Sequence, residues 1–140
     1  VDERAEAGGA PADWHGTETI LGVEDEELIL AVTSGMLERS GYRVLAACTP
    51  EGALELARGS DGRIDLLLSD VIMPDMTGPA LAERVRAAHP DLKVLYTSGY
   101  TANVIAHRGV LDPGVNFLPK PFTRRQLSEK VRRVLDGLER

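Results

Sequence analysis

The chain has 140 residues, a net charge of −6, and 43% hydrophobic and 27% charged residues, which suit one globular domain with its own core. No apolar run approaches the about 20 residues that a membrane-spanning helix needs, and the first residues do not resemble a signal peptide. The negative charge argues against nucleic acid as a direct partner. We therefore expect a domain that binds neither a membrane nor nucleic acid directly.

Cysteine and histidine residues predict neither a disulfide nor a metal site. Cys48 is the one cysteine and follows Leu45, Ala46 and Ala47, so we expect a buried, inert thiol and a reducing, cytoplasmic location. The three histidines lack metal-ligand spacing, and we expect them at the surface or at helix ends: His15, His89 and His107.

The first 17 residues differ in composition from the rest of the chain. They are rich in alanine, glycine and charge and show no hydrophobic period, which is typical of a linker or disordered tail. Within this stretch, Trp14 is a candidate for docking on the domain. We place the domain itself at residues 18–140.

Short apolar, β-branched runs alternate with helical patterns from Thr19 onward. The runs predict strands at 19–23, 43–47, 64–69, 93–98 and 115–118. Helical periodicity predicts helices over 26–39, from Thr49 to about Arg58, from Pro79, over 101–109, and from Thr123. The segment 101–109 is the weakest of these candidates because it is short.

Local signals mark the starts of two helices. Thr49 is an N-cap followed by Pro50 at the first helical position, and Thr123 forms a capping box with Gln126. The helix over 26–39 has three apolar residues on one face: Ile29, Val32 and Met36.

Strands that alternate with helices imply parallel pairing through right-handed crossovers. The expected fold is therefore α/β, with one open, doubly wound sheet that helices cover on both faces. In such a sheet the functional site lies at the carboxyl ends of the strands, near the change in strand order. The residues just after each strand are thus the candidates for function.

Polar residues stand at the ends of four predicted strands. Glu24 and Asp25 follow the first strand, Asp70 the third, Ser98 ends the fourth, and Lys120 follows the fifth. Each has a structural explanation of its own, such as a helix cap for Asp25 or an Asx turn for Asp70. Those explanations do not account for the meeting of all five at one edge, which indicates a site.

These residue types are suited to phosphoryl chemistry. Clustered carboxylates repel one another, and a hard divalent cation such as Mg²⁺ relieves the repulsion while leaving positions for phosphate oxygens. A carboxylate beside such an ion can attack phosphorus and form an aspartyl phosphate. Lys120 is suited to neutralise one phosphoryl oxygen and Ser98 to donate a hydrogen bond to another, while Gly99 leaves room for the group.

Four motifs, ILGVEDEE, DLLLSDVIMPDMTG, VLYTSGY and FLPKPF, occur in an order that resembles the receiver domain of two-component response regulators. The resemblance covers about residues 18–138. It implies a five-stranded sheet of flavodoxin-like order 2-1-3-4-5. It also implies phosphoryl transfer to Asp70 from the phosphohistidine of a histidine kinase or histidine phosphotransfer protein, with Mg²⁺ (or Mn²⁺) as cofactor and at most slow self-dephosphorylation.

The resemblance further implies how the acidic residues divide their roles. Asp25 and Asp70 bind the metal ion directly, Glu24 assists through water, and the backbone carbonyl of Ile72 is a further ligand. Three residues depart from the family pattern: Gly22, Glu24 and Pro119. Gly22 weakens the first strand, Glu24 is one methylene longer than the commoner Asp, and Pro119 removes a backbone donor. None of these changes deletes a required group.

The switch that the resemblance implies lies beside the site. Ser98 is the switch hydroxyl, Lys120 bonds to the phosphoryl group, and Phe117 and Tyr100 are the switch aromatics. Their movement remodels the face of the fourth predicted helix, the fifth strand and the last helix, which is also a candidate face for a homodimer. A cis peptide bond between Lys120 and Pro121 is also implied.

The sequence leaves the wider context open. The stretches GTETILGVEDEE and VLYTSGYT resemble receivers of hybrid sensor histidine kinases, so we favour a receiver excised from such a kinase, with a free-standing single-domain regulator as the alternative. A pseudo-receiver used only for interaction typically lacks the acceptor Asp or the Lys. A phosphohydrolase would want an acid where Ile72 stands, and a flavodoxin-like electron carrier would want a phosphate loop after the first strand.

Overall fold

Five parallel strands form one sheet in the order β2-β1-β3-β4-β5 in the computed structural model, which describes residues 14–60, 62–98 and 115–137. The strands are β1 (Thr19–Val23), β2 (Arg43–Ala47), β3 (Leu66–Asp70), β4 (Lys93–Ser98) and β5 (Phe117–Pro119). The predicted doubly wound α/β fold and its strand order 2-1-3-4-5 are confirmed. Three of the strands have the predicted bounds, whereas β3 and β5 each begin two residues later than predicted.

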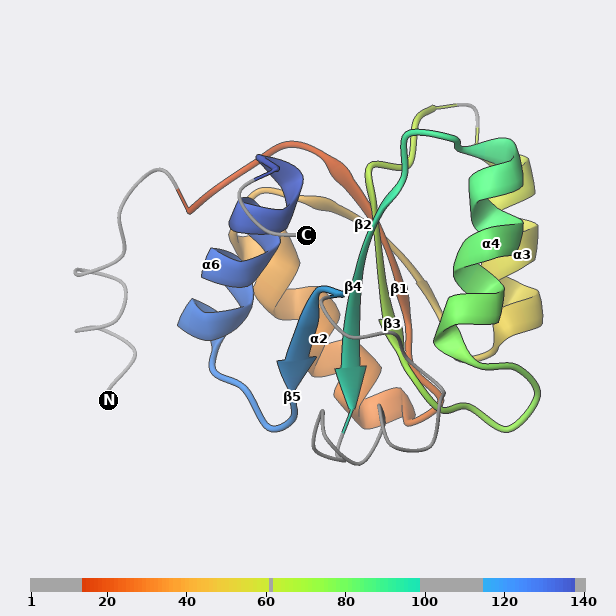
Figure 1. Cartoon of the computed structure of the whole chain (residues 1–140). Coiled ribbons are helices and arrows are strands. Elements are labelled where there is room, and N and C mark those ends of the chain that lie inside the picture. The colour runs from red at the N-terminus through yellow and green to blue at the C-terminus, as the bar shows by residue number, and fades with distance from the viewer. Residues whose placement is uncertain (1–13, 61, 99–114, 138–140) are drawn as a thin grey trace.

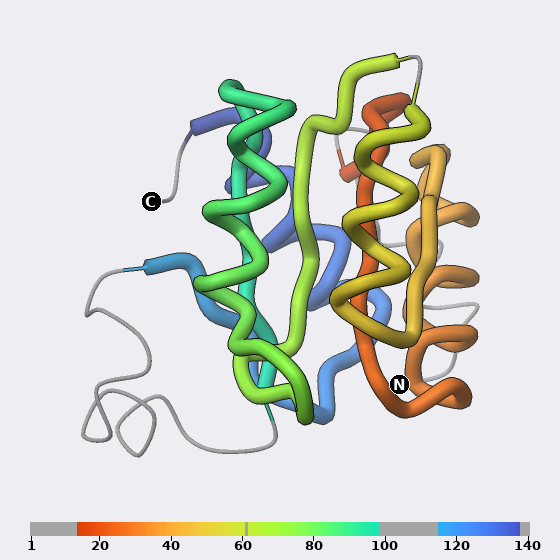
Figure 2. The backbone as a smooth tube through the Cα atoms, turned by 90° about the vertical axis from the view of Figure 1, so that its right-hand side faces the viewer, coloured from red at the N-terminus to blue at the C-terminus, as the bar shows by residue number. Residues whose placement is uncertain are grey.

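Helices cover both faces of the sheet. They are α2 (Glu27–Arg39), α3 (Pro50–Gly59), α4 (Gly78–Ala88) and α6 (Arg124–Leu135). Helices α2 and α6 lie together on one face and α3 and α4 on the other (Figure 1). Turned by 90°, α3 and α4 run side by side in front of the strands (Figure 2). The predicted helix over 101–109 lies outside the described residues.

The central strand β3 is buried along its whole length. Leu67 contacts the core under α3 and α4, whereas Leu66 and Leu68 contact the core under α2 and α6. A run of three leucines therefore contributes side chains to two hydrophobic cores, as expected for a parallel strand that is covered on both faces. This burial fixes the position of Asp70, the last residue of β3.

The two helix starts predicted from capping signals are confirmed. Thr49 accepts a hydrogen bond from the Gly52 N–H at 3.0 Å, and Thr123 and Gln126 form both hydrogen bonds of a capping box. Helix α4 begins at Gly78, one residue before the predicted start, because Thr77 caps it. The cis peptide bond between Lys120 and Pro121 is also present.

Some apolar side chains of α2 are buried in the core and others are exposed. Leu30 and Leu37 are the buried residues of this helix, whereas Leu28 and Val32 are 77% and 49% exposed. The three residues predicted to share a face do so, and together they line a surface groove of about 540 Å³, although Met36 also packs against the core under α2 and α6. Cys48 is half-buried, where full burial was expected. Within the described part of the chain, no helix has the length and apolar character to cross a membrane.

Candidate acidic site at the carboxyl edge of the sheet

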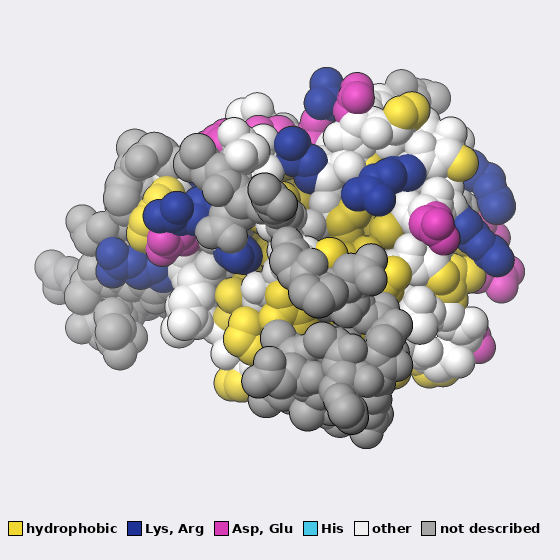
Figure 3. Space-filling model, in the orientation of Figure 1, with side chains coloured by type: hydrophobic (Ala, Val, Ile, Leu, Met, Phe, Trp, Pro, Cys, Tyr) yellow, Lys and Arg dark blue, Asp and Glu magenta, His cyan; other side chains and the backbone are white. Residues whose placement is uncertain are grey.

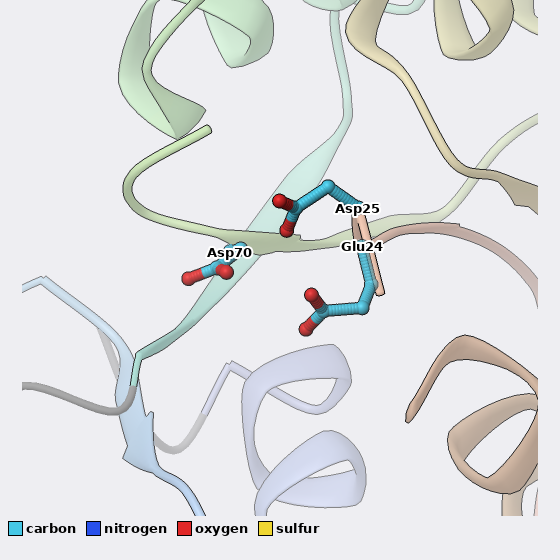
Figure 4. Close-up of side chains that lie close together, drawn as sticks. All are labelled: Glu24, Asp25 and Asp70. Carbon is cyan, nitrogen blue, oxygen red and sulfur yellow. The ribbon is translucent and has the colours of Figure 1, made fainter. Parts of the chain in front are cut away.

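Three carboxylates meet at the carboxyl edge of the sheet. Glu24 and Asp25 follow β1, Asp70 ends the neighbouring β3, and one oxygen from each lies within 4.8 Å of the others. The Asp25 and Glu24 side chains extend toward the side of the sheet edge on which Asp70 lies (Figure 4). Glu24 and Asp70 are buried, with 6% and 9% of their surfaces exposed, while Asp25 is exposed. The meeting of these residues, predicted from strand order, is confirmed.

Lys120 supplies the positive charge of the site. Its Nζ donates hydrogen bonds to Glu24 Oε1 at 2.8 Å and to Asp70 Oδ2 at 3.3 Å. Its backbone N–H donates to the Ser98 carbonyl at 2.9 Å, which ties the end of β5 to the end of β4. The Lys120 side chain is 16% exposed, so protein covers most of it.

The charges at this site do not balance. Burial raises the pKa of Asp70, although the charge and hydrogen bond of Lys120 act in the opposite direction. Burial likewise raises the pKa of Glu24 against its hydrogen bond to Lys120. Burial alone would lower the pKa of Lys120, but Glu24 and Asp70 outweigh it and raise that pKa. One ammonium thus faces three carboxylates, two of which are costly to keep ionised.

The turn after β3 holds Asp70 in place. The Val71 N–H donates to the Thr97 carbonyl at 2.9 Å, and the Gly78 N–H donates to the Val71 carbonyl at 2.7 Å. A Cβ atom at Gly78 would lie 2.6 Å from the Asp70 carbonyl oxygen, so no side chain fits there. The sequence gives no signal for this role of Gly78, because its contact with the Asp70 backbone depends on how the turn folds.

The remaining predicted site residues differ in their burial and in their position relative to this cluster. Ser98 is buried at the end of β4, next to Lys120. Phe117 begins β5 and packs, half-buried, against the core under α3 and α4. Ile72 lies in the turn after Asp70 with its side chain 37% exposed. Tyr100 lies outside the described residues.

The donor set fits a hard divalent cation. All three side chains offer oxygen, which Mg²⁺ and Mn²⁺ prefer and softer metals do not. The excess negative charge would be relieved by such an ion. In the ranges 14–60, 62–98 and 115–137, no other group of three or more acidic, histidine or cysteine side chains is close enough to share a metal ion.

Comparisons with known proteins agree with this architecture. The family model of the response regulator receiver domain matches residues 20–132, from β1 into α6. Sensor kinase CckA of Brucella abortus (strain 2308) is 38% identical over 124 residues, which make up 89% of this chain but 13% of that protein. Response regulator receiver protein CpdR of the same organism is 31% identical over 116 residues, which make up 83% of this chain and 95% of that protein.

A solved structure is similar in both fold and sequence. The receiver domain of the hybrid histidine kinase CckA superposes with a TM-score of 0.70 at 40% identity, and the match covers 84% of this chain and 98% of that one. The chain therefore matches a small part of the Brucella abortus kinase and nearly the whole of the crystallised receiver domain.

Proposed function

Because this chain belongs to the response regulator receiver domain family of two-component systems, we propose that Asp70 accepts a phosphoryl group from a phosphohistidine. The position of Asp70 carries this proposal. It ends the central strand, contacts Lys120 and lies within reach of two further carboxylates. An Asp70 Oδ atom attacks the phosphorus, an O–P bond forms as the P–N bond breaks, and the electron pair returns to the imidazole of the donor.

Lys120 takes part in this transfer as a counter-charge. Its ammonium is shared between Glu24 and Asp70 before transfer. As the phosphoryl group arrives, the ammonium moves onto one of its oxygens and offsets the added negative charge. Ser98, at the end of the adjacent strand, donates a hydrogen bond to a second oxygen.

The proposed cofactor is Mg²⁺ (or Mn²⁺), held by Asp25, Asp70 and the Ile72 carbonyl. When bound, it neutralises charge on the phosphoryl oxygens. Glu24 is suited to an indirect role, since one of its oxygens accepts from Lys120 and the other accepts the Glu26 N–H at 3.2 Å. Its carboxylate therefore positions Lys120 and reaches the ion through water.

The proposed switch follows from the same movement of Lys120. Ser98 shifts toward the phosphoryl group and Phe117 follows, with Tyr100 as the second aromatic, so that the surface of β5 and α6 is remodelled. A homodimer through this surface remains a prediction, which light scattering before and after phosphorylation would test.

The proposed donor is a histidine kinase or histidine phosphotransfer protein. Exposed apolar side chains on α2, Leu28 and Val32, line the surface groove together with Lys120 and Phe122. A groove of this kind beside the acceptor is suited to an apolar helix face of the donor. Similarity to a receiver within the kinase CckA favours a hybrid kinase as the parent protein, while similarity to CpdR keeps the single-domain alternative. The sequence of the complete gene separates the two.

Intact-mass measurement tests the proposed acceptor. With Mg²⁺ and a small phosphodonor such as acetyl phosphate, we expect the chain to gain one hydroxylamine-labile phosphoryl group. Asp70→Asn should abolish the gain, whereas Asp75→Asn, a matched change at an exposed residue of the same turn, should not. Undiminished labelling of Asp70→Asn would contradict the assignment, and a wild-type chain that never labels would favour a pseudo-receiver.

A further inference from the structure

Residues 14–18 precede β1 and lie against α6; we call them the strap. Figure 1 shows the strap, in red, running past α6 on its way into β1. Arg132 of α6 binds Glu18 through two parallel hydrogen bonds, Nη2 to Oε2 at 2.6 Å and Nη1 to Oε1 at 3.0 Å. Nη1 also donates to the His15 carbonyl at 3.0 Å. One guanidinium therefore holds both the backbone and a side chain of the strap, and the proposed phosphoryl transfer uses none of these contacts.

Other parts of the domain hold Arg132 in position. Asp136, one turn later on α6, accepts from Nε at 3.2 Å and from Nη2 at 2.8 Å. The Tyr42 hydroxyl, just before β2, lies 3.4 Å from Nη1. The Arg132 side chain is only 16% exposed. A fixed, planar fork with several partners makes a geometrically specific contact, unlike an ordinary surface ion pair.

The backbone of the strap fits closely against the turn before β2. The Gly16 N–H donates to the Ser40 carbonyl at 3.1 Å. A Cβ atom at Gly16 would collide with Tyr42 and Arg132, and one at Gly41 would lie 2.5 Å from the Gly16 carbonyl oxygen. Gly41 also has a φ of +99°, which favours glycine. Glycines lie where the two backbones approach each other, so the close packing of the strap depends on the absence of side chains there.

Trp14 extends the strap along α6. Its ring lies 5.2 Å from the guanidinium carbon of Arg125, within the range of a cation–π contact. Arg125 and Arg132 are seven residues apart, so the strap contacts α6 over about 10 Å of its length. Figure 3 shows Lys and Arg side chains on the side of the molecule where α6 lies as well as on the opposite side.

Helix α6 is connected directly to the acidic site. Its N-cap, Thr123, comes three residues after Lys120, and Phe122 between them packs into the core under α2 and α6. A shift of Lys120 onto a phosphoryl group therefore moves the start of a rigid helix. The strap, by contrast, is also anchored to the start of β2, where the Arg43 N–H donates to the Glu18 carbonyl at 3.0 Å.

We propose that the docking of the strap on α6 through Arg132 is coupled to the phosphorylation state of Asp70. The coupling makes the strap a device that transmits the state of the site to the part of the chain before Trp14. The coupling rests on the proposed function, because it requires phosphorylation of Asp70. The docking of the strap on α6 does not depend on that function. Because such coupling is reciprocal, release of the strap also changes how favourable phosphorylation is.

Trp14 is the one tryptophan of the chain, so acrylamide quenching of its fluorescence reports on the strap. In the 140-residue chain without phosphodonor, we expect Arg132→Gln and Glu18→Gln to raise the quenching constant toward that of a free tryptophan. Arg133→Gln is the matched control, because the exposed Arg133 pairs with Glu129 of the same helix and not with the strap. Circular dichroism verifies that each variant is folded. Equal quenching in all four proteins would overturn the docking.

The second measurement repeats the quenching after phosphorylation, with intact mass recorded on the same sample. We expect the docking equilibrium of the wild-type strap to change on the order of fivefold, at the low end of typical allosteric coupling. The change should be absent in Asp70→Asn and in Arg132→Gln. A phosphorylated chain with unchanged quenching overturns the coupling and leaves the proposed function intact. Failure of the wild-type chain to gain a phosphoryl group overturns both.

Discussion

An ionic cluster lies at each end of strand β1, and the carboxylates of the two clusters are compensated by their basic partners to different extents. Before its first residue, Glu18 receives two hydrogen bonds from the fork of Arg132. After its last residue, Glu24 shares the single ammonium of Lys120 with Asp70. The hydrogen bond from Arg132 lowers the pKa of Glu18, whereas burial raises the pKa of Glu24 and of Asp70.

This difference separates a structural carboxylate from a functional one. The first cluster is satisfied by the protein alone and stabilises the fold. The second retains unfavourable electrostatic free energy, which a cation and a phosphoryl group are suited to release. The count of charges does not distinguish the clusters, because each has one basic residue and more than one acid; the burial of Glu24 and Asp70, against the partial exposure of Glu18 and Asp136, does.

The largest expected effect is the loss of the satisfied cluster. Arg132→Ala should lower the free energy of unfolding by about 2–3 kcal/mol, because it leaves Glu18 and Asp136 without their partner and removes a well-covered side chain. Arg133→Ala, in an exposed pair on the same helix, should cost at most about 0.5 kcal/mol. Urea denaturation at pH 7 measures both. Equal losses would mean that the Arg132 cluster is no more than a surface ion pair.

Part of this contrast was predictable from the sequence. Asp70, Glu24, Asp25 and Lys120 could be brought together in advance because strand alternation places the carboxyl ends of parallel strands at one edge. Thr49, like the capping box at the start of α6, was predictable because a cap depends on residues three positions apart.

The Arg132 cluster was not predictable in the same way. Glu18 and Arg132 are 114 positions apart, and nothing in a helical pattern distinguishes Arg132 from its neighbour Arg133. The exposure of Val32 likewise depends on the angle at which α2 meets the sheet, which periodicity does not fix. The division into a linker at 1–17 and a domain at 18–140 stays a prediction.

Neutralising one acid at each end of β1 should change the free energy of unfolding in opposite directions. In buffer without divalent cations at pH 7, Asp70→Asn should raise the free energy of unfolding by about 1 kcal/mol, because it removes a buried charge that Lys120 only partly offsets. Glu18→Gln should lower it by about 1 kcal/mol, because a charge-assisted pair becomes a neutral hydrogen bond. The same sign for both variants would contradict the comparison.

The pKa shifts of Asp70 and Glu18 determine how the stability changes caused by Asp70→Asn and Glu18→Gln depend on pH. The folded-state pKa of Asp70 lies above 3.8, so its destabilising charge is present above that raised pKa and disappears as the pH falls through it. The folded-state pKa of Glu18 lies below 4.5, so its stabilising charge is present above 4.5 and is lost as the pH falls through the lowered pKa. Unfolding curves in an acid series should therefore show both the Asp70→Asn gain and the Glu18→Gln loss shrinking as the pH falls.

The smallest expected effect concerns Gly22, which lies between the two clusters in the middle of β1. A Cβ atom there would meet nothing closer than 3.9 Å, and a cavity of about 20 Å³ adjoins it. Gly22→Ala should raise the free energy of unfolding by about 0.5–1 kcal/mol, because it restricts the unfolded chain without strain in the folded one. Thermal denaturation measures the gain, while phosphorylation and Trp14 quenching should stay at wild-type values. If either changed, the two ends of β1 would be linked through the strand itself, and the proposed route through α6 would not be the only connection between them.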